Sequence, residues 1–146
     1  MANKITNLVE HEFTFPQLDR EATPNYQPYL KMSFYFRKRA DITHQEFHEH
    51  WQTVHADLAT SAAPFAQYVT RYTQTHQTPE LKEKLQKFGN MQMLDFDGCS
   101  EIWVRSYEDG EKFFQSEEYV KAMAGRSRRF LDLLGTTTLI SSSYRR

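Results

Sequence analysis

The residues best suited to chemistry in this 146-residue chain are its histidines, because imidazole accepts and releases protons near neutral pH. Four of the six lie within residues 44–55, namely His44, His48, His50 and His55. His55 is the leading candidate for a general acid/base, and His48 for a second one or for a ligand of a substrate phenol. Structural alternatives stay open: His55 could bond a backbone carbonyl, and His48 could be a partly exposed residue on the helix flank.

Apolar spacing indicates how a helix would carry these histidines. At about 100° per residue, one stripe of the segment is apolar, formed by Phe47, Trp51, Val54 and Leu58. His55 lies at the edge of that stripe, one turn beyond Trp51, and His48 lies two turns before it on the same edge. The spacing therefore suits a pocket wall in which the Trp51 indole lies beside the His55 imidazole.

Aromatic residues supply further candidates. A phenol can hydrogen-bond a substrate carbonyl or stabilise an enolate, so Tyr72 is a candidate catalytic residue. Candidate substrate-binding residues are Trp51, Tyr35, Tyr68, Phe34 and Phe113. Core tyrosines that only satisfy their own hydroxyls are the structural alternative. Asp97 and Glu101 are carboxylates at a predicted buried strand, where each needs a partner or a function.

Motifs for metals and cofactors do not occur in the sequence. There is no H-E-x-x-H, cysteine cluster, P-loop, G-x-G-x-x-G or G-x-S-x-G pattern. His44 and His48 have helical i,i+4 spacing but no third ligand nearby. We therefore expect no metal and no cofactor. Cys99, the one cysteine, excludes an internal disulfide and is expected to be a buried small residue.

Charge and hydropathy limit the class of protein further. The 18 basic and 19 acidic residues give a net charge of −1, which argues against a dedicated nucleic-acid binder. No apolar run reaches the length of a membrane span, and the N-terminus lacks an apolar signal core. The sequence predicts a cytoplasmic protein that binds neither nucleic acid nor membrane.

The first strand and the histidine helix are the clearest predicted elements. In residues 29–37, Met32, Phe34 and Phe36 alternate with residues that are themselves partly aromatic, which predicts a strand buried on both faces. The sequence Thr43-His44-Gln45-Glu46 has the form of a capping box. The helix should therefore start near His44 and extend to about Ala62, with Pro64 stopping it.

The remaining elements follow from β-propensity and from helix signals. Strands are predicted at residues 65–75, 98–106 and 136–141. A short helix is predicted over residues 80–88, ended by Gly89. Residues 107–134 should be helical in two parts, the second running from Ser116, with a bend at Gly125 and Gly135 as C-cap. Residues 1–28 are predicted to form an arm over the domain, with Phe13 and Phe15 as anchors or a lid.

This element order predicts an α+β fold of the ferredoxin-like βαββαβ type with a short helical insertion, spanning residues 29–146. Helices should cover one face of the four-stranded sheet. The uncovered face is expected to be rich in aromatic and aliphatic side chains. Because such a face is rarely left in water, we expect two sheets to pack face to face in a homodimer.

Several motifs of the sequence are typical of one family. They are Phe34-Tyr35-Phe36-Arg37-Lys38, Phe47, Trp51, His55-Ala56-Asp57-Leu58, Asp97-Gly98, Phe113-Phe114 and Ser116-Glu117-Glu118-Tyr119. Through these motifs the sequence resembles the EthD-domain family of the dimeric α/β-barrel superfamily, over about residues 29–143. The chain departs from the family at Asp57, because family members commonly have proline after His-Ala.

The resemblance implies a dimer with one pocket per subunit between sheet and helices. Many fungal relatives are cofactor-independent tailoring enzymes of aromatic polyketide biosynthesis. The resulting hypothesis is a lyase that decarboxylates a fused-ring polyketide acid, with His55 cycling the proton and a tyrosine steadying the enolate. The alternatives are a dehydratase or cyclase, a cofactor-free anthrone oxygenase, and a non-catalytic dimer that binds an aromatic ligand.

Overall fold

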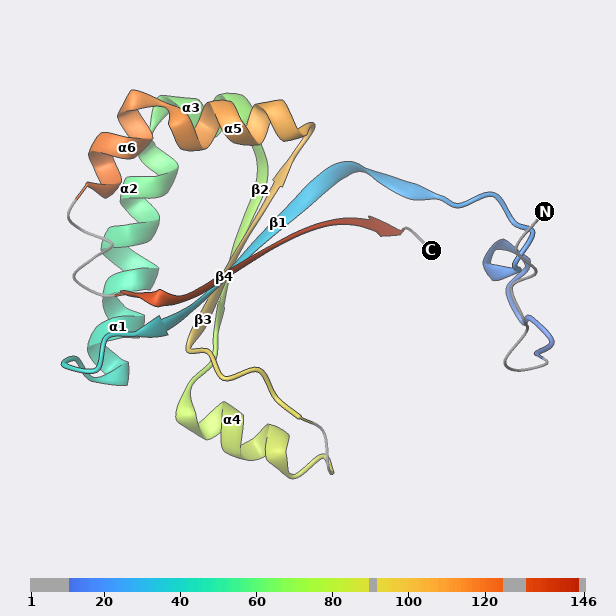
Figure 1. Cartoon of the computed structure of the whole chain (residues 1–146), viewed down its shortest axis with the longest axis horizontal. Helices are drawn as coiled ribbons and strands as arrows, with labels where there is room; N and C mark the ends of the chain where they lie inside the picture. Colours follow the sequence, from blue (N-terminus) through green and yellow to red (C-terminus); the bar gives the residue numbers. More distant parts are fainter. Residues whose placement is uncertain (1–10, 90–91, 125–130, 145–146) are drawn as a thin grey trace.

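A computed structural model describes residues 11–89, 92–124 and 131–144, the last of these by backbone. Its sheet has four strands: β1 (Tyr26–Lys38), β2 (Val69–His76), β3 (Gly98–Val104) and β4 (Leu131–Tyr144). They lie in the order β2-β3-β1-β4, and every neighbouring pair is antiparallel (Figure 1). This is the ferredoxin-like arrangement that the element order predicts.

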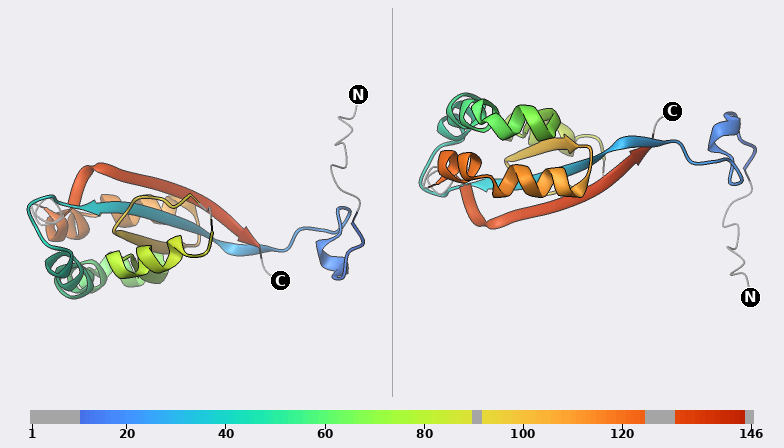
Figure 2. Two further views of the ribbon diagram at one scale, coloured as in Figure 1. Left: turned by 90° about the horizontal axis from the view of Figure 1, so that it is seen from below. Right: turned by 90° about the horizontal axis from the view of Figure 1, so that it is seen from above.

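Helical segments connect these strands. Between β1 and β2 run α1 (His44–His50), a π-helical turn η2 (Trp51–His55), α2 (Ala56–Ser61) and α3 (Ala63–Tyr68). Between β3 and β4 run α5 (Tyr107–Gln115) and α6 (Glu117–Met123), and α4 (Pro79–Gln86) is the short insertion between β2 and β3. Helices α2 and α3 pack against α5 and α6 over one side of the sheet (Figures 1 and 2).

The capping box sets the start of the first helix. The Thr43 hydroxyl accepts a hydrogen bond from the Glu46 backbone N–H at 3.1 Å, and the Glu46 carboxylate accepts from the Thr43 N–H at 2.8 Å. Both donors would otherwise lack partners at a helix end. The helix therefore begins at His44, as predicted.

The π-helical turn shifts the buried stripe of this helix. The Ala56 N–H bonds to the Trp51 carbonyl five residues back, which widens the turn, so residues four apart keep nearly the same direction. The buried positions are consequently Phe47, Trp51 and Ala59. The prediction that Val54 belongs to the stripe is wrong, because its side chain is 42% exposed, and His55 lies partly buried in its place.

Trp51 anchors the helix on the sheet. Its side chain is 1% exposed and forms a core cluster with Phe36 and Phe47, the Phe36 ring meeting it edge-on at 5.4 Å between centroids. At Gly98 of β3, a Cβ atom would lie only 2.5 Å from the indole ring. Glycine is therefore required where the strand passes beneath the indole. A second cluster, formed by Met32, Val69, Ile102, Val104 and Phe113, fills the other end.

Several predicted boundaries are wrong for local reasons. Residues 65–68 are helical, because Ala62 takes an extended conformation that ends α2, and Pro64 then sits in the first turn of α3, where it is tolerated. The start of the second helical part is predicted correctly: α6 follows Ser116, whose hydroxyl caps it by accepting from the Tyr119 N–H. Residues 131–134 and Gly135 belong to β4. The expected bend at Gly125 lies outside the described residues.

The uncovered face of the sheet is less apolar than predicted. Lys31 and Glu101 form an ion pair of 2.8 Å on this face, and Glu101 also accepts hydrogen bonds from Ser33 and Thr73. The Lys31 hydrogen bond holds the pKa of Glu101 below its usual range. Trp103 lies between two cations, with the Arg71 guanidinium 4.8 Å from its ring centroid. The uncovered face therefore holds both aromatic rings and an ionic network, because the alternate strand residues that point to it include both kinds of side chain.

The described part of the N-terminal segment, residues 11–25, does not lie over the helices (Figure 1). The described residues 11–25 include one short 3-10 helix, η1 (Pro16–Leu18), and lead away from the helical layer (Figures 1 and 2). The Phe15 side chain is 45% exposed, and Phe13 contacts His11 edge-on at 4.9 Å. Strand β1 begins at Tyr26, so the last residues of the predicted arm belong to the sheet.

The buried indole predicts a large loss of stability when it is removed. Trp51→Ala should lower the free energy of unfolding by about 3–5 kcal/mol, because it leaves a cavity against Phe36, Phe47 and β3. Urea denaturation measures this change. Phe88→Ala, at a side chain 74% exposed, is the control and should change stability by less than about 0.5 kcal/mol. Equal effects of the two substitutions would contradict the packing described.

His55 predicts acid sensitivity of the fold. Burial, and secondarily the charge of His50, lower the pKa of His55 from 6.5 to about 4. The unfolded chain therefore binds the proton more readily, and stability present above pH 6.5 is lost as the pH falls toward 4. Unfolding measured at pH 7 and 4.5 should show a decrease that is roughly 2–3 kcal/mol larger for the wild type than for His55→Gln. An identical decrease in both proteins would mean that His55 titrates normally.

Candidate active site

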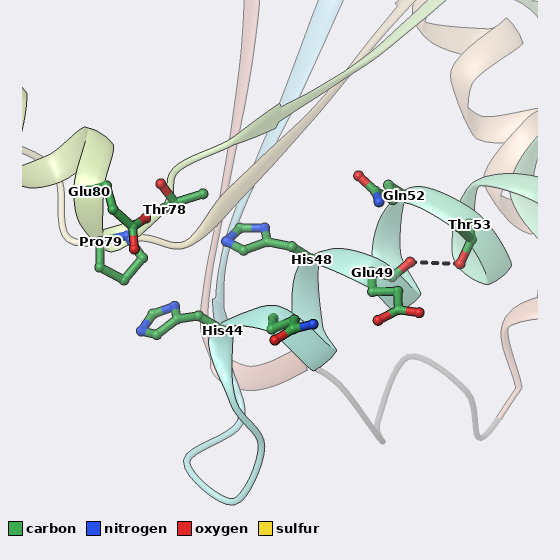
Figure 3. Close-up of a pocket in the computed structure, with 9 residues that line it drawn as sticks. His44, His48, Glu49, Gln52, Thr53, Thr78, Pro79 and Glu80 are labelled. Carbon is green, nitrogen blue, oxygen red and sulfur yellow. Dashed lines mark hydrogen bonds between the residues drawn. The ribbon is translucent and has the colours of Figure 1, made fainter.

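An open pocket of about 590 Å³ lies between the α1–η2 segment and the insertion helix α4 (Figure 3). One wall comes from α1 and η2, and the other from the N-terminal end of α4. The His44 and His48 rings stack with centroids 6.4 Å apart and point toward Thr78 and Glu80 on the opposite wall. The lining residues are His44, Gln45, His48, Glu49, Gln52, Thr53, Thr78, Pro79 and Glu80.

A chain of hydrogen bonds leads from this pocket toward the core. His48 Nδ1 lies 2.8 Å from His76 Nδ1, and His76 Nε2 lies 3.1 Å from Gln74 Oε1. The Gln74 amide nitrogen donates both to the Trp51 carbonyl at 2.9 Å and to the Tyr72 hydroxyl at 2.7 Å. Strand β2 supplies Tyr72, Gln74 and His76 from alternate positions, so all three face the helices.

His48 and His76, the two histidines of this hydrogen-bonded chain, are neutral near pH 7. Burial, followed by the charges of His76 and His44, lowers the pKa of His48, while Asp97 and Glu80 oppose that shift. Burial alone lowers the pKa of His76. His48 Nε2 is shielded from solvent and has no hydrogen-bond partner among the described residues. A neutral imidazole with an unbonded nitrogen at a pocket can act as a general base.

A buried carboxylate, Asp97, lies beside the histidines. Asp97 is 7% exposed and accepts hydrogen bonds from the Lys38 N–H at 2.9 Å and from Lys82 Nζ at 3.1 Å, with His44 Nδ1 at 3.7 Å. Burial raises the pKa of Asp97, but these hydrogen bonds and the Lys82 charge outweigh it and keep the pKa below its usual range. The partner that a buried Asp97 requires is therefore Lys82.

The predicted catalytic residues are not all brought together. His48 lines the pocket, whereas His55 is not among its lining residues. The His55 imidazole makes no hydrogen bond to another described residue. Tyr72 is partly buried against the second core cluster, and its hydroxyl accepts from Gln74. Burial raises the pKa of Tyr72, opposed by hydrogen bonds with Gln74 and Ser100, so this phenol is neutral at pH 7.

The predicted substrate-binding residues lie mostly in the core. Phe113 is buried in the second cluster, and Phe34 and Tyr68 pack against it. Tyr35 lies on the uncovered face, against Phe96 with ring centroids 5.0 Å apart. Trp51 lies beneath the site, where its ring contacts His76 at 4.4 Å between centroids. These roles stay predictions, but the described pocket is more polar than the one expected.

Sequence reasoning did not select His76 and Gln74. The signal for them is the alternation of Tyr72, Gln74 and His76 along one strand, which places three hydrogen-bonding side chains on a face that should be apolar. Their partners are a helix carbonyl and a histidine distant in the sequence. Only the tertiary structure shows that these groups meet.

The described residues form neither a metal site nor a membrane-spanning helix. In the part of the chain that the structure describes, no three histidine, cysteine, aspartate or glutamate side chains converge as ligands for a metal ion. Among the same residues, no helix combines the length and apolar character needed to cross a bilayer.

Similar structures share the fold at low sequence identity. A dimeric ferredoxin-like protein of unknown function from Thermobifida fusca has a TM-score of 0.55 and 12% identity, covering 92% of this chain and 100% of that one. A variant of SnoaB, a cofactor-independent oxygenase from Streptomyces nogalater, has a TM-score of 0.52 and 11% identity, covering 82% and 97%. Hydroxynitrile lyase from Passiflora edulis has a TM-score of 0.50 and 11% identity, covering 85% and 96%.

The sequence comparison gives the family. No curated protein sequence matches the chain. The EthD domain family matches it over residues 39–134, a range that contains the capping box, the π turn, β2, α4 and β3. The match therefore includes every element that lines the pocket and spans well over half of the sequence. The chain belongs to the EthD domain family.

Proposed function

We propose that this chain is a cofactor-independent lyase that decarboxylates an aromatic polyketide acid, with His48 as the proton carrier. The observation that carries the proposal is the neutral His48, which lines the pocket while its Nδ1 is hydrogen-bonded to His76 and its Nε2 has no partner among the described residues. The family match and the fold shared with a lyase and a cofactor-independent oxygenase support the enzyme class.

The proposed reaction needs one group that first accepts a proton and then returns it. His48 Nε2, which is shielded from solvent in the free protein and must be uncovered when the substrate binds, takes the proton of a β-keto or ortho-hydroxyaryl carboxylic acid. In a β-keto acid, the bond to the carboxyl carbon then breaks, CO₂ leaves, the electron pair enters the neighbouring carbonyl as an enolate, and protonated His48 returns the proton to the carbon. In an ortho-hydroxyaryl acid, protonated His48 first gives the proton to the ring carbon that bears the carboxylate; the bond to the carboxyl carbon then breaks, CO₂ leaves, and the electron pair restores the aromatic ring. Gln52 lines the same pocket and carries N–H donors for the enolate oxygen.

His48 suits this role better than His55. An efficient general base has a pKa near the working pH, and the pKa of about 4 at His55 lies far below neutrality. His48 also has an orienting partner in His76, which a catalytic imidazole requires. The nearby carboxylates Asp97 and Glu80 favour the protonated form that the mechanism generates.

The charge of the lining favours a second candidate reaction. Glu49 and Glu80 are carboxylates, and the lining of the described pocket contains no lysine or arginine. A substrate without a carboxylate, such as a hydroxylated anthrone, fits this charge. His48 would then remove a proton from carbon, and the carbanion would react with O₂ or expel a β-hydroxide as water. CO₂ release, O₂ uptake and water loss separate these reactions.

The proposal predicts that His48→Gln lowers turnover by about 10²–10⁴-fold, because glutamine keeps a hydrogen-bonding side chain but cannot cycle a proton. The assay incubates the purified chain with fused-ring ortho-hydroxyaryl and β-keto acids and follows product by mass spectrometry. Wild-type activity should persist at neutral pH and decline on acidification, because only neutral His48 accepts the proton.

His55→Gln is the matched control, since it is the same substitution on the same helical segment. It should retain activity at pH 7. Loss of activity in His55→Gln with full activity in His48→Gln would transfer the role to His55. Ligand binding without turnover by the wild type would support the non-catalytic alternative.

We also propose that the chain acts as a homodimer through the uncovered sheet face. Support comes from the dimeric state named for a structure of the same fold, and from Trp103 and Tyr35 on this face. A face with a satisfied ionic network can be buried without leaving charges unpaired, because Lys31 and Glu101 already neutralise each other.

Sedimentation should therefore show a dimer at micromolar concentration, and dilution should lower the thermal unfolding temperature because dimerisation and folding are linked. Trp103→Ala removes the largest aromatic surface of the face and should weaken the dimer. Val120→Ala, at an exposed residue of α6, is the control. A folded wild-type monomer at this concentration would refute the proposal.

A further inference from the structure

We infer that His76 and Gln74 are positioning residues that hold His48 in its Nδ1–H tautomer, with the Trp51 backbone carbonyl as the fixed reference. The chain of contacts runs from that carbonyl through Gln74 and His76 to His48. Its consequence for catalysis rests on the proposed function, but the tautomer itself does not.

The first step is the orientation of the Gln74 amide. A backbone carbonyl can only accept hydrogen bonds, so the Gln74 group 2.9 Å from the Trp51 oxygen must be the NH₂. The second hydrogen of this NH₂ reaches the Tyr72 hydroxyl at 2.7 Å. The amide oxygen is thereby directed at His76.

The second step fixes the two imidazoles. The Gln74 oxygen accepts only, so His76 Nε2, 3.1 Å away, must carry the hydrogen. Neutral His76 then presents Nδ1 as an acceptor. His48 Nδ1, at 2.8 Å, must donate to it, which leaves the lone pair of neutral His48 on Nε2. The nitrogen without a partner among the described residues is therefore the basic one.

The fold supplies both parts of this arrangement. The Trp51 carbonyl is in the π turn, where it accepts from the Ala56 N–H and from Gln74, as its two lone pairs allow. The Trp51 ring packs against the His76 ring, with centroids 4.4 Å apart. The His48 ring contacts the same His76 ring, with centroids 5.0 Å apart. The π turn that moves His55 inward thus also provides the reference for His48.

The test is the tautomer of His48 in the full chain, read from the ¹⁵N shifts of its ring nitrogens in a long-range ¹H–¹⁵N spectrum at neutral pH. His48→Gln assigns its signals and His76→Gln those of His76. The expected wild-type result is a protonated Nδ1 and bare Nε2 at His48, with a protonated Nε2 at His76. A protonated Nε2 at His48 overturns the inference, whether or not the protein turns over any substrate.

Gln74→Met removes the lock while keeping the length of the side chain. His48 should then exchange between both tautomers, and kcat on any substrate that the wild type converts should fall by about 10–100-fold, as for loss of a residue that orients a ligand histidine. KM should change little. Gln115→Met, at an exposed residue of α5, is the control and should leave the wild-type spectrum unchanged. A wild-type spectrum in Gln74→Met would also overturn the inference.

The two proposals fail in different ways. If His48 is the Nδ1–H tautomer but no acid is converted, the lock holds and the decarboxylase proposal fails. If His48→Gln abolishes turnover but the wild-type tautomer is Nε2–H, the proton carrier is correct and the positioning residues are not.

Discussion

The packing of Trp51, at the junction of α1 and η2, against β3 is the contact on which the rest of the structure depends. The indole is almost fully buried against Phe36 and Phe47, and it approaches the backbone of Gly98 so closely that no side chain fits there. This contact fixes the height of α1 above the sheet. It also places the Trp51 carbonyl within reach of Gln74 on β2, so one residue couples apolar packing to the orientation of a polar chain.

The electrostatics of the site follow from where the charges are compensated. Asp97 is paired with Lys82 and the Lys38 N–H, so a buried carboxylate stays ionised beside the histidines. Desolvation keeps His48 and His76 neutral, while the carboxylates of Asp97 and Glu80 favour the protonated form of His48. A base that is neutral at rest and stabilised once charged is what a proton carrier requires.

The two faces of the sheet have separate tasks because side chains alternate along each strand. Met32, Ile102 and Val104 build the core on the helix side. On the other side, Lys31 and Glu101 form the ionic network with Trp103 above it. The uncovered face is therefore suited to recognition of another surface, while the polar chain at the edge of the helix side is reserved for chemistry.

Local rules in the sequence determined the fold class, the family and the start of the histidine helix. The capping box at Thr43 and the alternation in β1 depend only on neighbours in the chain, so both could be predicted. The same holds for the buried Phe47 and Trp51, whose spacing of four residues is that of a regular helix. The sequence also names His48 as a candidate acid/base from its residue type, and that role stays a prediction.

Only the tertiary structure decided the remaining features, because they depend on residues far apart in the sequence. A regular 100° period cannot reveal a π turn. The Val54 side chain is therefore exposed where burial was expected, and His55 is partly buried. The extended Ala62 that separates α2 from α3 is likewise set by packing. Most clearly, His76 acquires its role from contact with His48 and Trp51, distant in sequence, since a tautomer is fixed by partners that no local pattern specifies.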